Sequence, residues 1–110
     1  MIAEKDIDKA LAYLRTSAEE AATARANMKY LAEFLKSKRA QLKVGQTGLS
    51  NAAAEDAALA DPAYLEVLDG YRIAVEVDAR HQFKREAASA LIDAWRTQQS
   101  TLRAEGKAYQ

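Results

Sequence analysis

The sequence predicts an all-α fold, a long antiparallel helical hairpin that resembles a coiled coil. Residues that favour helices, chiefly Ala, Leu, Glu, Lys, Arg and Gln, dominate the 110-residue chain, which has one proline and four glycines. Apolar residues recur every seven positions through its first part. A break with two glycines follows, and then a second long helical pattern. We expect a single domain that covers residues 1–110.

The first predicted helix covers about residues 3–44. A row of apolar residues runs along it at intervals of seven: Ile7, Leu14, Ala21, Met28, Leu35 and Leu42. Alanine and leucine flank the row and widen it to the stripe that a helix buries in a bundle. The middle of the stripe is mostly alanine, which predicts a close-packed waist or, alternatively, a groove for a partner. Gly45 is expected to end the helix in the left-handed conformation.

The connector is expected at residues 45–61, with a short helix at about residues 51–60. Asp61 and Pro62 then predict the start of a second long helix, at about residues 62–105, because aspartate caps a helix and proline suits its first position. The row expected to be buried advances in steps of three and four: Leu65, Leu68, Tyr71 or Arg72, Val75, Ala79, Phe83, Ala87, Ala90 or Leu91, Ala94 and Trp95, then Leu102. Recurrences eleven residues apart within this row predict straighter packing than a strict seven-residue repeat.

Charge favours antiparallel pairing of the two long helices. The end of the first helix is rich in Lys and Arg, whereas the connector and the early second helix are rich in Asp and Glu. Folding back at the connector places these two blocks side by side. The whole chain has 16 basic and 16 acidic residues, so no net charge draws it towards nucleic acid or an anionic membrane.

Two paired helices bury one stripe each, and the aromatic residues are too widely spread for a single seam. They include Tyr13, Tyr30, Phe34, Tyr64, Tyr71 and Trp95. A second copy of the chain is the usual cover for such residues, so we expect a homo-oligomer, a dimer that forms a four-helix bundle.

Enzyme chemistry finds little support in the sequence. The chain has no cysteine, and its one histidine, His81, would need a pocket that two long helices do not supply. Asp78 stands where the Glu-x-x-His motif of bundle metal sites needs a glutamate. We therefore expect no catalytic residue, no cofactor and no metal site. With no long apolar run and no signal sequence, we also expect no membrane segment and a cytoplasmic location.

The second half of the second helix has an excess of basic and aromatic residues that the hairpin does not explain. These residues form the candidate interaction surface: Arg80, Lys84, Arg85, Trp95, Arg96 and Arg103. Basic side chains contact phosphate, and an exposed tryptophan stacks on a base. Acidic residues are interleaved with them, as on an ordinary solvated face. Two functions follow: a non-enzymatic binding or adaptor protein with a protein partner or, alternatively, a direct single-stranded nucleic-acid binder.

Three segments resemble a family of small helical proteins of tailed bacteriophages and prophages. The segments are residues 60–65 (Ala-Asp-Pro-Ala-Tyr-Leu), 94–100 (Ala-Trp-Arg-Thr-Gln-Gln-Ser) and 103–109 (Arg-Ala-Glu-Gly-Lys-Ala-Tyr). The resemblance implies an accessory to phage replication or recombination, or to host takeover, in the cytoplasm of a bacterial host cell. It brings no catalytic residues. A toxin-like protein that inhibits a host enzyme is a third possibility.

Overall fold

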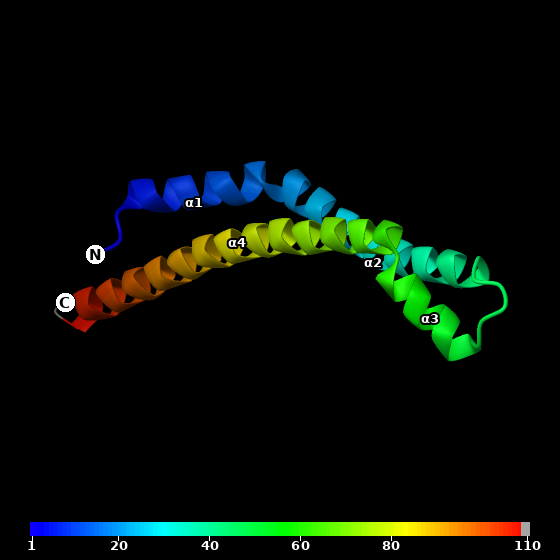
Figure 1. Ribbon diagram of the computed structural model, residues 1–110. Helices are drawn as coiled ribbons and strands as arrows, with labels where there is room; N and C mark the ends of the chain where they lie inside the picture. The colour runs from blue at the N-terminus through cyan, green and yellow to red at the C-terminus, as the bar shows by residue number, and fades with distance from the viewer. Residues whose placement is uncertain (109–110) are drawn as a thin grey trace. The chain divides into compact units, whose positions relative to one another are not determined.

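The computed structural model describes residues 1–108, and Figure 1 labels its four helices. They are α1 (Glu4–Thr16), α2 (Ala18–Val44), α3 (Asn51–Ala60) and α4 (Pro62–Ala108). No strand occurs within the described part of the chain, so the prediction of an all-α protein is confirmed. The chain divides into two compact units. The terminal unit combines Met1–Ala21 with Arg80–Gln110, and the central unit is Ala22–Ala79.

The first predicted helix is interrupted at Ser17, which separates α1 from α2. The N–H of Ser17 still makes a helical hydrogen bond of 2.9 Å, so the distortion is local. Its physical cause is Arg85, whose Nη1 donates to the carbonyl oxygen of Leu14 at 2.8 Å. In an uninterrupted helix that oxygen accepts from the N–H of Ala18, and a side chain inserted into this ladder bends or breaks a helix. The expectation of one helix over residues 3–44 is therefore wrong at this point.

The turn after α2 also differs from the prediction. The N–H of Gly45 donates to the carbonyl of Gln41 at 3.2 Å, and Gly45 does not adopt a positive φ. Gly48 is the glycine in the left-handed region, with φ of 78°, a conformation that costs glycine little because it has no Cβ. The expected left-handed helix end at Gly45 is therefore wrong, and the chain reverses three residues later.

The start of α4 is capped as predicted. The side-chain Oδ1 of Asp61 accepts a hydrogen bond from the N–H of Ala63 at 2.8 Å, which satisfies one of the unpaired donors at the helix start. At its other end, α4 continues through Gly106 to Ala108 and so passes the predicted end at residue 105. Tyr109, which belongs to one of the segments that resemble phage proteins, lies outside the described residues.

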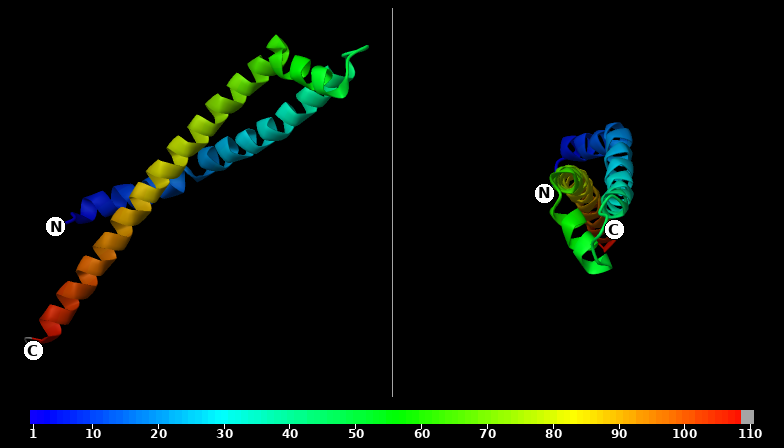
Figure 2. Two further views of the ribbon diagram at one scale, coloured as in Figure 1. Left: turned by 60° about the horizontal axis from the view of Figure 1, so that its bottom comes forward. Right: turned by 45° about the vertical axis from the view of Figure 1, so that its right-hand side comes forward.

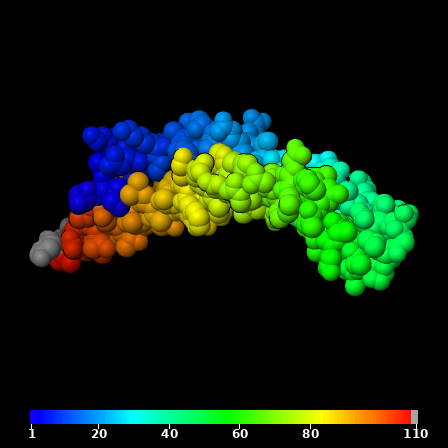
Figure 3. Space-filling model, in the orientation of Figure 1, coloured from blue at the N-terminus to red at the C-terminus, as the bar shows by residue number. Residues whose placement is uncertain are grey.

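In the terminal unit, α1 runs antiparallel to the C-terminal part of α4 (Figure 1). The N–H of Ile2 donates to Oε1 of Gln98 at 3.2 Å near the start of α1. The space-filling view shows the blue N-terminal residues against the orange part of α4 (Figure 3). Three buried residues form the core of this unit, and partly buried residues pack around them: Ile7, Ala10 and Ile92, surrounded by Ile2, Leu14, Ala88, Leu91 and Trp95.

In the central unit, α3 connects the end of α2 to the start of α4 (Figure 2). Its buried hydrophobic residues are alanines from α3 and α4: Ala54, Ala58 and Ala74. Two ion pairs link the helices of this unit. Arg39 of α2 pairs with Glu55 of α3, and Nε of Arg25 in α2 lies 3.1 Å from Oδ1 of Asp78 in α4. The first of these pairs joins the basic and acidic blocks seen in the sequence.

The row of α4 that is buried is not the predicted one. The inner row, as we call it, repeats in steps of three and four, and each of its residues is buried or partly buried: Val67, Tyr71, Ala74, Asp78, His81, Arg85, Ala88, Ile92, Trp95 and Gln99. Most of the predicted row is exposed, and Phe83, which it placed in the core, is 68% exposed, whereas Tyr71 and Trp95 belong to both rows and are partly buried. The predicted buried face of α4, with its eleven-residue spacing, is therefore wrong.

Replacing Ile92 by alanine tests the core of the terminal unit. Ile92 is 7% exposed, so Ile92→Ala is expected to lower the free energy of unfolding by about 2 to 4 kcal/mol, because it leaves a cavity. The matched control is Ile73→Ala. Ile73 is 47% exposed, and its loss is expected to cost under about 1 kcal/mol. Urea unfolding followed by circular dichroism measures both variants, and equal losses would contradict the assignment of this core.

Candidate functional site

All six residues of the candidate interaction surface lie on α4 in the terminal unit, but they do not form one surface. Arg85 is partly buried and bonded to α1 and to Ser17. Trp95 packs against the core of the unit. The other four residues are exposed and lie on two sides of the helix: Arg80, Lys84, Arg96 and Arg103. The structure thus divides the predicted surface into three parts with different surroundings.

Arg85 belongs to the interior of the terminal unit. One of its guanidinium nitrogens, Nη1, donates to Oγ of Ser17 at 2.7 Å and to the carbonyl oxygen of Leu14 at 2.8 Å. Hydrogen bonds from a charged donor are stronger than those between neutral groups. These bonds hold Arg85 against the break in the first helix, so its guanidinium serves the fold of this unit.

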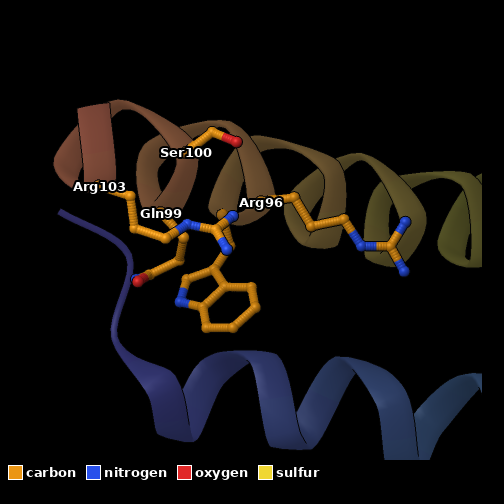
Figure 4. Close-up of a pocket in the computed structure, with 5 residues that line it drawn as sticks. Arg96, Gln99, Ser100 and Arg103 are labelled. Carbon is orange, nitrogen blue, oxygen red and sulfur yellow. The ribbon is translucent and has the colours of Figure 1, made fainter. Parts of the chain in front are cut away.

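Trp95, Arg96 and Arg103 do come together. With Gln99 and Ser100 they line an open depression of about 530 Å³ on α4. Figure 4 shows that the labelled side chains come from one stretch of the helix, with Gln99 and Ser100 on opposite sides of it. This depression offers an indole, the guanidinium group of Arg103 and two neutral polar side chains, whereas the guanidinium group of Arg96 extends along the helix away from Arg103 (Figure 4).

The other two exposed basic residues lie away from this depression. At about 100° of rotation per residue, Arg80 and Lys84 fall on one flank of the inner row of α4, and Arg96 and Arg103 fall on the other. A single ligand on one face of the helix therefore cannot contact all four. Arg96 is also close to an acidic neighbour, because its Nη1 lies 3.7 Å from Oδ1 of Asp93. That pair is exposed and so contributes little to stability.

Sequence reasoning missed two polar contacts that lie on the packed faces. One is the contact of Arg85 with Ser17 in the terminal unit. The other is in the central unit, where Arg25 donates two hydrogen bonds to the carboxylate of Asp78 at 3.1 and 3.4 Å. The spacing carried a signal for both, since Asp78 and Arg85 are seven residues apart in a row with Tyr71 and Ile92. Because two residues of that row are charged, a search for apolar residues does not detect the row.

Two kinds of feature are lacking in the part of the chain that the structure describes. Within residues 1–108, no group of three His, Asp or Glu side chains is placed to hold a metal ion. Nor is any helix in this part of the chain both long and apolar enough to cross a membrane. The features that remain are exposed apolar side chains and the depression beside Trp95.

Comparison with known proteins gives no further guidance, since the chain matches no protein-family model, no curated protein and no solved structure.

Substitution of Arg85 tests its structural role. Arg85→Met keeps an unbranched apolar stem but removes the donor to Ser17 and Leu14, and it is expected to lower the free energy of unfolding by about 1 to 3 kcal/mol. The control is Lys84→Met at the neighbouring exposed position, which is expected to change stability by less than about 0.5 kcal/mol. A double-mutant cycle with Ser17→Ala isolates the contact. A coupling energy near zero would show that this bond contributes nothing.

Proposed function

We propose that this protein is a non-enzymatic binding or adaptor protein that works as a homo-oligomer. The observation that carries the proposal is the area that one chain leaves exposed, 7970 Å². A folded monomeric protein of 12.1 kDa exposes about 6,000 Å². The chain therefore presents about 2,000 Å² more surface than a self-sufficient monomer of its mass.

The small core supports the same proposal. Among residues 1–108, the buried hydrophobic residues number six, and four of them are alanine: Ile7, Ala10, Ala54, Ala58, Ala74 and Ile92. Alanine removes little apolar area from water, so it contributes little to the free energy of folding. Many larger apolar side chains remain exposed, among them Leu65, Leu68, Ile73 and Phe83. A second copy would bury more of this surface and add to the stability of both chains.

The aromatic residues support self-association less than their spread in the sequence implied. We expected six aromatic residues to be too widely spread for one seam between two helices. Of these six, Tyr30 is exposed, but the other five are partly buried within one chain. Tyr30 stacks on Phe34, with ring centroids 6.1 Å apart. The need for a second copy therefore rests on the aliphatic residues of α4.

In this proposal two copies pair their helices in a four-helix bundle, and the surface left outside the bundle binds a protein partner. The binding role follows from what the described residues offer, namely apolar and charged surface. The resemblance to phage proteins would place the partner in DNA metabolism or among host proteins.

Self-association is tested by the dependence of mass and stability on concentration. We expect light scattering after gel filtration to give the mass of a dimer or larger oligomer, and the melting temperature to rise with protein concentration, because association stabilises only the folded state. A monomeric mass from micromolar to millimolar protein, together with a constant melting temperature, would contradict the proposal.

A second candidate function is the binding of single-stranded nucleic acid, and the depression beside Trp95 favours it. Arg96 and Arg103 lie seven residues apart on one face of α4, next to the only tryptophan of the chain. Guanidinium groups contact phosphates, and an indole stacks on bases without requiring a particular sequence. The net charge of zero limits such binding to this local patch.

The sole tryptophan reports directly on this second function. Titration with a single-stranded oligonucleotide at low salt is expected to quench its fluorescence, with an affinity that falls as salt rises. The double variant Arg96→Gln and Arg103→Gln is expected to weaken binding by about tenfold or more. The double variant Arg80→Gln and Lys84→Gln removes the same charge from the other flank and is expected to retain binding. Equal loss in both variants, or no quenching of the wild type, would exclude the depression as the site.

A further inference from the structure

We propose that a second copy of this chain docks on the outer face of α4 in the central unit, along a row that we call the outer row. Its residues are Leu65, Leu68, Arg72, Val75 and Ala79. The inference rests on the proposed self-association and specifies the surface through which two copies associate.

The outer row has the spacing of a helix-pairing seam. Its residues follow one another in steps of three, four, three and four, the pattern by which the inner row packs. The three large aliphatic side chains of the outer row, Leu65, Leu68 and Val75, are between 37 and 48% exposed. This part of the helix thus has two seams, and the described structure of the central unit fills only the inner one.

Apolar side chains of this segment also lie outside the two rows, beside the charged residues Glu66, Asp69 and Glu76. Ile73 and Val77, which belong to neither row, are exposed as well. A helix that is apolar on all sides is normally buried, whereas a helix on the surface has one polar face. This segment of α4 lies between these two cases, because exposed aliphatic side chains stand next to charged ones.

Arg72 is the one charged residue in the outer row, and its charge is matched on its own helix. Its Nε lies 3.0 Å from Oδ1 of Asp69, and its Nη1 lies 3.8 Å from Oε2 of Glu76. Burying an ion whose partner is missing is costly, and burying it together with its partner offsets part of that cost. Arg72 therefore does not prevent burial of the row, and a single polar residue in a seam fixes the register of pairing.

A second copy is the occupant that fits the row. Both copies present the same residues, as an isologous two-fold interface requires. A stable interface buries about 800 Å² on each partner, and this chain exposes about 2,000 Å² beyond the surface of a compact monomer. The row is centred on Arg72, with Leu65 and Ala79 at equal distances in sequence on either side of it.

The first test places a carboxylate in the row. Leu68→Asp is expected to weaken dimerisation by about 100-fold or more, because the interface would bury an unpaired charge. The matched control is Ile73→Asp, which adds the same charge at a position of similar exposure outside the row and is expected to leave the dimer intact. Sedimentation equilibrium measures the association, and circular dichroism verifies that both variants are helical.

The second test uses the absence of cysteine in the chain, which makes any introduced thiol unique. Disulfides form only where two Cα atoms approach to about 4.4 to 6.8 Å. In a parallel pair, Leu65→Cys and Ala79→Cys are each expected to cross-link with themselves under mild oxidation. In an antiparallel pair they are expected to cross-link only with each other, in a mixture of the two variants. Ile73→Cys is the control and should remain unlinked.

The outcomes separate this inference from the proposed function. If Leu68→Asp remains a dimer and no cysteine of the row cross-links, the chain self-associates through another surface, and only the outer row is excluded. If the wild type is monomeric, both proposals fail. Loss of the dimer in Leu68→Asp but not in Ile73→Asp, together with cross-links within the row, supports the outer row as the interface.

Discussion

A pair of helices buries one stripe on each partner, and α4 carries two rows with the spacing for that role. The inner row packs against α1 in the terminal unit, and its residue Asp78 pairs with Arg25 of α2 in the central unit. Because only one row can face inward, the other is left with its leucine and valine side chains exposed. The core, the exposed surface and both proposals about function depend on this choice.

Where the inner row has few large apolar side chains, some of its residues make polar contacts with neighbouring helices. In the terminal unit, Arg85 bonds to Ser17 and to the carbonyl oxygen of Leu14. In the central unit, Asp78 bonds to Arg25. Such contacts are directional, so they define register more sharply than alanine side chains can, and this register decides which apolar residues face solvent. The break in the first helix follows from the contact of Arg85. Its guanidinium donates to the carbonyl oxygen of Leu14, which in an uninterrupted helix accepts a backbone hydrogen bond.

The candidate interaction surface shows how far residue type alone carries a functional prediction. All six residues were chosen for charge or aromaticity, and three of them do meet at one depression: Trp95, Arg96 and Arg103. Arg85 is instead bonded within the fold, and Arg80 and Lys84 lie on the other flank of α4. A helix separates neighbouring residues by about 100°, so basic residues close together in sequence need not share a face.

The sequence by itself determined the helical class, the seven-residue row of the first helix, the short helix of the connector and the cap at Asp61, because these depend on local propensity, periodicity and capping. Only the tertiary structure decided which face of α4 is buried, where the first helix breaks and which arginine is internal. Each of these depends on contacts between residues more than fifty positions apart, such as Arg25 with Asp78 and Ser17 with Arg85. Local pattern could not choose between two rows that both have helical spacing, since the choice lies in the partners that each row meets.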